Sequence, residues 1–161
     1  QDMADRYYRL AKDFADIWQV LGLDTDKTHT KLEYYRNSTF SIKYNLLFQY
    51  ILEEDLFPAS VMQTEIKYYL ANVLTPFGIP LDSRSSIAKL DWNYWIGAMG
   101  TQQEFEVLNR AGYHFAHTTP SRTPLTDWFD VKTGVIKGFT ARPVVGGLYA
   151  RALLNKIHGK H

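Results

Sequence analysis

The chain has 161 residues, of which 45% are hydrophobic and 22% are charged, a composition typical of one folded domain with a single core spanning residues 1–161. Its 18 basic and 17 acidic residues give a net charge of +1 and form no run of five or more like charges, which argues against nucleic acid and membrane partners. The absence of cysteine excludes disulfides, thiolate metal sites and thiol nucleophiles.

Helical periodicity dominates the first half of the chain. Leu10, Phe14 and Ile17 recur at spacings of three and four, which predicts a first helix that Gly22 ends. Residues 24–39 are polar and predict a loop, in which Asn37 begins an N-glycosylation motif that favours a secreted glycoprotein. Apolar residues predict a second helix from residue 40 to about residue 55 and a third over residues 59–74.

The second half combines helices with turn signals. Two prolines and a glycine break the pattern in residues 75–86, and aromatic residues then predict helices around 92–99 and 105–115. Residues 127–139 contain two alternating runs around a Lys-Thr-Gly turn, which predicts a small β-hairpin. A last helix is expected to begin at Pro143. The expected fold is therefore all-α, with six to seven helices and one hairpin.

Four collinear blocks of the sequence resemble the secreted glutaminase A-type proteins of fungi and bacteria. They begin at residues 41, 77, 120 and 138 and read SIKYNLLFQYILEEDLFP, FGIPLDSRSSIAKLDWNYWIGAM, PSRTPLTDWFD and GFTARPVVGGLYARAL. The resemblance implies an extracellular L-glutamine amidohydrolase without a metal or other cofactor, built as the C-terminal half of a six-hairpin, glycosidase-like α/α toroid. Because half a toroid leaves apolar helix faces uncovered, we expect self-association or a companion polypeptide.

Two acid-tryptophan pairs, Asp91-Trp92 and Asp127-Trp128, are candidates for chemistry. An aspartate among tryptophans loses hydration, which raises its pKa, so we expect Asp91 to act as a general base and Asp127 to supply the second carboxylate. A carboxylate pair also suits a glycoside hydrolase. The structural alternative is that each tryptophan fills the core while each aspartate caps an element or forms an ion pair.

Lys89 is a further catalytic candidate, because Ser86 precedes it by three residues and some amidases pair a serine with a lysine. Helix capping by Ser86 explains the same spacing. His114 and His117 have no carboxylate at matching spacing, so we predict no metal site there.

Substrate charge is expected to be bound by Arg142, Asp82 and Arg84, with Trp92 and Trp128 lining the cleft. Arg142 precedes a proline-led helix start whose free N–H groups favour an anion such as the α-carboxylate of glutamine. The alternative is an ion pair of Arg142 with Asp127 or Asp130.

The glycines at 146 and 147 require a close neighbour, which is either a ligand or another helix. Besides a glutaminase-like hydrolase or a fragment of one, the sequence leaves open a non-catalytic half-toroid that binds a glycan or a protein through its aromatic loops.

Overall fold

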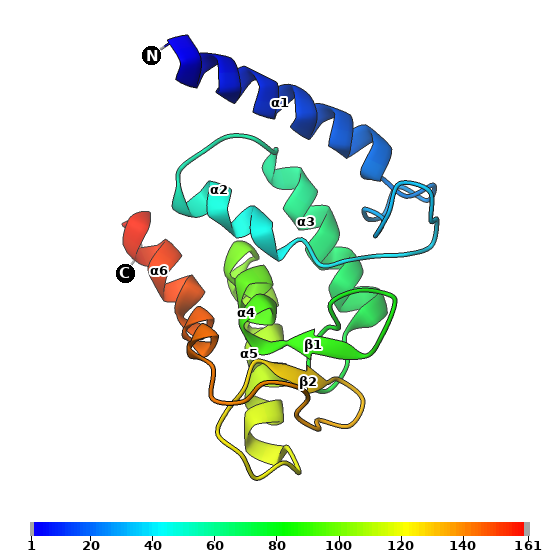
Figure 1. Ribbon diagram of the computed structural model, residues 1–161, viewed down its shortest axis with the longest axis vertical. Helices are drawn as coiled ribbons and strands as arrows, with labels where there is room; N and C mark the ends of the chain where they lie inside the picture. The colour runs from blue at the N-terminus through cyan, green and yellow to red at the C-terminus, as the bar shows by residue number, and fades with distance from the viewer. Residues whose placement is uncertain (1, 160–161) are drawn as a thin grey trace.

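The computed structural model describes residues 2–159, which form six α-helices, three short helical segments and a two-stranded sheet (Figure 1). The helix α4 (Leu90–Met99) lies at the centre, where it contacts α2 (Leu47–Ile51), α3 (Ala59–Tyr68), α5 (Gln102–Thr118) and α6 (Ala150–Ile157). The all-α prediction is confirmed. Among the described helices, none combines the length and the apolar character that crossing a bilayer requires.

The first helix, α1 (Asp2–Gly22), ends at Gly22 as predicted and lies across the tops of α2 and α3 in Figure 1. One side of α1 is fastened to the loop that joins those helices, because Trp18 packs edge-on against Phe57 and Lys12 donates a hydrogen bond to the carbonyl of Asp55. Another side exposes an apolar stripe at alternating spacings of four and three, made of Met3, Tyr7, Leu10, Phe14, Ile17 and Leu21.

The second predicted helix is much shorter than expected. Residues 40–42 are extended, and only the short segment η1 (Tyr44–Leu46) and α2 are helical. The backbone of this extended segment pairs with residues 81–83: Ile42 N–H donates to the carbonyl of Leu81 at 2.9 Å, and Ser83 N–H donates to that of Phe40 at 3.0 Å. The helix prediction was wrong here because pairing with residues 81–83 holds this segment extended, which buries the side chains of Phe40 and Ile42 on one side of it.

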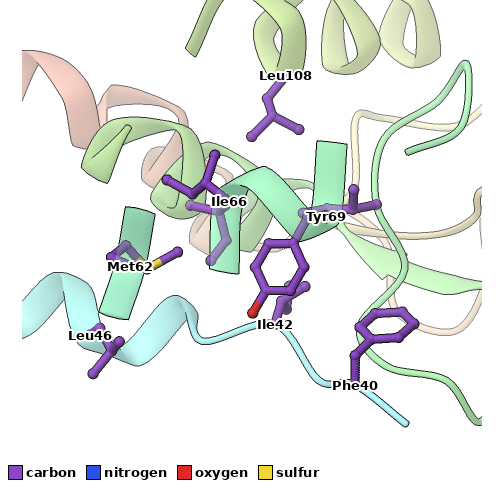
Figure 2. Packing of buried hydrophobic residues seen from close by; sticks show 9 residues of the cluster. Phe40, Ile42, Leu46, Met62, Ile66, Tyr69 and Leu108 are labelled. Carbon is purple, nitrogen blue, oxygen red and sulfur yellow. The ribbon is translucent and has the colours of Figure 1, made fainter. Parts of the chain in front are cut away.

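The main core lies between this extended segment and α3, which continues into a π-helical turn, η2 (Tyr69–Val73) (Figure 2). Figure 2 shows the Tyr69 ring inside the cluster with its hydroxyl directed toward the segment that carries Ile42. Burial of each large apolar side chain contributes about 1.5–3 kcal/mol relative to exposure, so this cluster holds residues 40–46 firmly in place. Its labelled members are Phe40, Ile42, Leu46, Met62, Ile66, Tyr69 and Leu108.

The sheet joins two distant parts of the chain. Strand β1 (Ile87–Lys89) pairs antiparallel with β2 (Trp128–Asp130), so that Lys89 lies opposite Trp128. The predicted turn at Gly134 is present with φ +68°, and Phe129 forms an isolated bridge to Ile136. The sequence did not predict β1, although it is the main partner of β2.

The C-terminal helix begins at Pro143 as predicted, but its first part, η3 (Pro143–Tyr149), is a 3₁₀-helix that continues into α6. Gly147 lies directly against α4: a Cβ atom there would be 2.5 Å from Trp95 Nε1 and 2.8 Å from Asp91 Cβ. At Gly146 an added Cβ would meet nothing within 4 Å. Of the two explanations for the glycine pair, contact with another helix therefore accounts for Gly147.

Candidate functional site

Four charged residues that were singled out in the sequence meet beside α4, and we call them the acid cluster: Lys89, Asp91, Asp127 and Arg142. Lys89 ends β1, Asp91 lies in the first turn of α4, and Asp127 directly precedes β2. The β1–β2 pairing brings these residues together, and a hydrogen bond of 2.6 Å from Leu90 N–H to the carbonyl of Asp127 fixes their backbones.

Asp127 is the ion-pair partner of both cations. Its side chain is 0% exposed, and its Oδ2 lies 2.7 Å from Lys89 Nζ and 3.3 Å from Arg142 Nη1. Arg142 thus makes the ion pair that was the alternative to carboxylate binding. A carboxylate enclosed in this way is held by its two cations, and removal of any partner leaves an uncompensated buried charge.

Asp91 is the unpaired member of the acid cluster. The residue is 3% exposed, and its Oδ1 has no hydrogen-bond partner within the described part of the chain. Burial, together with the negative charge of Asp127, raises the pKa of Asp91 to about 6, against the opposing attraction of Lys89. A carboxyl of this kind exchanges a proton near neutral pH, which is the property that acid-base catalysis requires.

Tryptophans surround the ammonium group of Lys89, whose nitrogen lies 5.2 Å from the ring centroid of Trp92 and 5.5 Å from that of Trp128. Trp92 stacks in turn on Tyr44, with 3.6 Å between the ring centroids. This stack connects the acid cluster to a neighbouring cleft, because both of its rings line that cleft.

The cleft has a volume of about 680 Å³ and lies between residues 41–46 and the loop over residues 81–84. Asp82 and Arg84 face each other in it as a bidentate pair, with 2.7 Å between Arg84 Nη2 and Asp82 Oδ2 and 3.0 Å between Arg84 Nε and Asp82 Oδ1. The Arg84 side chain is 64% exposed. Neither Asp91 nor Asp127 lines this cleft, whose polar and aromatic lining includes Lys31, Ser41, Lys43, Tyr44, Asn45, Asp82, Arg84 and Trp92.

Ser41 and Lys43 were missed in the sequence. Lys43 is 8% exposed, and its Nζ lies 2.8 Å from Ser41 Oγ and 2.6 Å from the Ser41 carbonyl oxygen. Burial lowers the pKa of Lys43 to about 8. The signal was the spacing of two: side chains two residues apart can meet where the backbone of residues 40–42 is extended, whereas a helix would have separated them.

Ser86 and Lys89 do not meet in the structure. Ser86 donates a hydrogen bond of 2.6 Å to Asp130, whereas Lys89 pairs with Asp127. The two histidines of α5 stack on aromatic rings, His114 on Phe77 and His117 on Tyr113. Asn37, the predicted glycosylation site, is exposed in a turn.

Asp24, Asp26 and His29 form a cluster that the sequence reasoning also missed, with potential ligand atoms within 4.8 Å of one another. The oxygens of Asp24 accept hydrogen bonds from the backbone N–H groups of Thr25 at 2.6 Å and Ser38 at 2.7 Å. His29 Nε2 lies 3.1 Å from the carbonyl oxygen of Thr39. These contacts fix the loop over residues 24–39.

Comparison with known proteins places this arrangement in a family context. The family model described as the glutaminase A six helical-hairpin domain matches residues 1–152. A glutaminase A of Aspergillus oryzae (strain ATCC 42149 / RIB 40) is 33% identical over 158 residues, which is 95% of this chain and 23% of the relative. A probable glutaminase of Arthroderma benhamiae (strain ATCC MYA-4681 / CBS 112371) is 27% identical over 183 residues, 92% of this chain and 21% of the relative.

The chain thus spans less than a quarter of the length of both fungal relatives. No solved structure gave a significant match.

Proposed function

This chain belongs to the family of the glutaminase A six helical-hairpin domain, and from that premise we propose that it hydrolyses the side-chain amide of L-glutamine to glutamate and ammonia. Similarity to fungal proteins named glutaminase supports this reaction type, and the cleft beside the Tyr44–Trp92 stack supports a small zwitterionic substrate.

Substrate recognition in this proposal depends on Asp82 and Arg84. Free glutamine carries an α-ammonium and an α-carboxylate, and the Asp82–Arg84 pair offers one charge of each sign at the cleft. The hydrogen bonds from Arg84 lower the pKa of Asp82, which keeps this carboxyl ionised at neutral pH. The substrate's α-carboxylate would pair with Arg84 and its α-ammonium with Asp82, which leaves the side-chain amide to extend along the cleft.

The contacts of the acid cluster support the structural alternative to catalysis, in which its aspartates form ion pairs that stabilise the fold. Asp127 is enclosed with its two cations, and Gly147 closes over the side chain of Asp91. A glycoside hydrolase needs two carboxylates that reach the substrate, one on each side of the scissile bond. We therefore propose that the acid cluster holds η3 and β2 against α4. The general-base role of Asp91 stays a prediction.

The proposed reaction is tested by measuring ammonia release from L-glutamine with the purified 161-residue protein. L-asparagine, whose side chain is one methylene shorter, is the control for chain length. The γ-methyl ester of glutamate, which has no side-chain amide, is the control for the amide. We expect saturable release from L-glutamine alone. Absence of ammonia from the folded protein would contradict the proposal, and saturable binding of a glycan in the same preparation would favour the non-catalytic alternative.

We also propose that the exposed apolar stripe of α1 binds a partner polypeptide. The exposed stripe of α1 consists of large apolar side chains at a spacing suited to helix packing. The family domain consists of six helical hairpins, whereas residues 2–159 contain six α-helices, which supports a partner made of further hairpins or of a second copy. Sedimentation equilibrium tests the second copy: a strictly monomeric 161-residue protein would contradict self-association.

Secretion and glycosylation are also proposed, from the exposed position of Asn37 in its Asn-Ser-Thr motif. Expression in a eukaryotic secretory host should give a product that loses mass on treatment with an endoglycosidase, and Asn37→Gln should remove that change. An unglycosylated wild-type product would contradict the assignment.

A further inference from the structure

Ser41 and Lys43 both line the cleft, and their side chains contact each other with 2.8 Å between Ser41 Oγ and Lys43 Nζ. We propose that Ser41 and Lys43 form a nucleophile-base pair that cleaves an amide bond of a ligand held in this cleft. The inference deepens the proposed function and rests on it for the identity of the ligand. A hydroxyl is a weak nucleophile until an adjacent base accepts its proton, and a lysine can be that base only as the neutral amine.

The pair is held rigidly. Ser41 forms an antiparallel bridge with Asp82, and the buried side chains of Phe40 and Ile42 anchor the residues before and after it in the core. Lys43 N–H donates a hydrogen bond of 3.1 Å to the Tyr69 hydroxyl, whose direction toward this segment is visible in Figure 2. A reacting pair needs fixed geometry, because a displacement of about 1 Å costs about 100-fold in rate.

The amine of Lys43 is buried without a carboxylate partner. Within residues 2–159 it forms no ion pair, and its nitrogen instead contacts the hydroxyl and carbonyl oxygens of Ser41. Burial lowers its pKa to about 8, and the negative charge of Glu65 opposes this shift. The neutral amine, whose lone pair can accept the Ser41 proton, is therefore accessible near neutral pH.

The other ionisable groups around Lys43 come from three elements. Glu65 of α3 shares its carboxylate between Thr30 N–H, at 2.6 Å, and the Tyr69 hydroxyl, at 2.5 Å. Lys31, Asp82 and Arg84 line the same cleft from the loops, where Asp82 and Arg84 neutralise each other. Because these acidic neighbours are bound to other groups, Lys43 can act as the base in the cleft, and its charge changes just above neutral pH.

The chemistry balances with water as the single co-reactant. Ser41 Oγ attacks the amide carbon while its proton passes to Lys43 Nζ, and Lys43 then delivers that proton to the amide nitrogen. The C–N bond breaks, ammonia leaves, and the acyl group remains as an ester of Ser41. Water next attacks the ester and gives up a proton through Lys43 to Ser41 Oγ, which releases the carboxylic acid. No electrons are transferred.

Lys89, the catalytic lysine that the sequence suggested, differs from Lys43 in the group that its amine contacts. Its nitrogen lies 2.7 Å from the carboxylate of Asp127 and within 5.5 Å of the ring centroids of Trp92 and Trp128. Lys89 is thus bound in an ion pair, whereas the Lys43 nitrogen contacts a serine hydroxyl.

Covalent labelling by an alkyl fluorophosphonate, which phosphonylates activated serines, tests the pair in the full 161-residue protein. We expect one adduct, mapped by mass spectrometry to Ser41, whose rate of formation rises with pH through about 8. Lys43→Met should lower that rate at least about 100-fold because the base is lost. Ser41→Ala should remove the adduct.

Ser60→Ala and Lys67→Met are matched controls, since both side chains are exposed on α3 away from the pair. Both should label at the wild-type rate. Circular dichroism confirms that each variant is folded, and Lys43→Arg, which keeps the charge but not the proton acceptor, should label as slowly as Lys43→Met. The proposal is overturned if folded wild-type protein gives no Ser41 adduct, or if Lys43→Met and Lys43→Arg label at the wild-type rate.

Ammonia release separates this proposal from the proposed function. Labelling of Ser41 without turnover of glutamine would remove glutamine as the ligand and leave the pair in place. Turnover of glutamine that persists in Ser41→Ala would leave the glutaminase function in place and overturn the pair.

Discussion

The acid cluster and the cleft both gather charged side chains around Trp92, yet they differ in what those side chains contact. In the acid cluster, Asp127 is fully enclosed and shared by Lys89 and Arg142. In the cleft, Arg84 is largely exposed, and Lys43 is buried against a serine hydroxyl. Convergence of charges therefore does not by itself make a reaction site, because side chains that neutralise one another below the surface are committed to stability.

The largest effect expected from this comparison is on folding. Asp127→Asn removes the charge that holds two cations at the join of β1, β2 and η3, so it should lower the free energy of unfolding by about 3–5 kcal/mol. Urea denaturation measures the change. Glu33→Gln is the control, because its pair with Arg36 is 54% and 55% exposed and should cost at most about 1 kcal/mol. Equal effects of the two substitutions would contradict the structural role of the acid cluster.

Gly147→Ala should lower the free energy of unfolding by about 1–3 kcal/mol, because the added methyl group overlaps Trp95 and Asp91. Gly146→Ala is the control, because an added Cβ atom there meets nothing within 4 Å, and it should be neutral or stabilising by up to about 1 kcal/mol. Thermal unfolding of the two variants compares them directly. Similar losses at both positions would show that η3 does not pack closely on α4.

The pH dependence of stability sharpens the role of Asp91. Its pKa is raised to about 6 in the folded protein from a usual value of 3.8, so the folded state binds the proton more tightly than the unfolded state. The stabilisation of the folded state by protonated Asp91 is therefore fully present below about pH 4 and is lost as the pH rises through 6. Relative to wild type, Asp91→Asn should therefore gain on the order of 1–2 kcal/mol above pH 7. Denaturation at pH 4 and pH 8 measures it, and a difference that does not change with pH would contradict the burial of this carboxyl.

The smallest of these effects is expected at the exposed end of the cleft. Arg84→Met removes the cation proposed to pair with the substrate carboxylate, so KM for L-glutamine should rise about tenfold while kcat changes little. Arg36→Met, which removes an exposed cation outside the cleft, should leave KM unchanged. A wild-type KM in Arg84→Met would remove the recognition role.

Much of the fold could be predicted from the sequence, because the longer helices carry strong local signals. Gly22 ends α1, the apolar period of α5 is reinforced by a Thr101–Glu104 capping box, and the turn at Gly134 needs a positive φ. The failures occur where tertiary contacts override local pattern. Residues 40–42 became extended because they pair with residues 81–83, about forty positions away.

The candidate site shows the same division. Pairs of acid and tryptophan residues were visible locally, and the β1–β2 pairing did bring Lys89 and Asp127 together. Whether a carboxylate opens to solvent or lies beneath η3 depends on the packing of Gly147 on α4, which no local pattern encodes. Ser41 and Lys43 were hidden for a related reason, since the pair exists only if their segment is extended.

Small ligands are expected to bind in the cleft and not at the acid cluster. Titration of ¹⁵N-labelled protein with L-glutamine, followed by amide chemical shifts, distinguishes the two places. We expect saturable shifts centred on residues 41–45 and 81–84, with little change at Asp91 and Asp127. Shifts centred on Asp91, Asp127 and Arg142, with residues 41–45 unaffected, would contradict it.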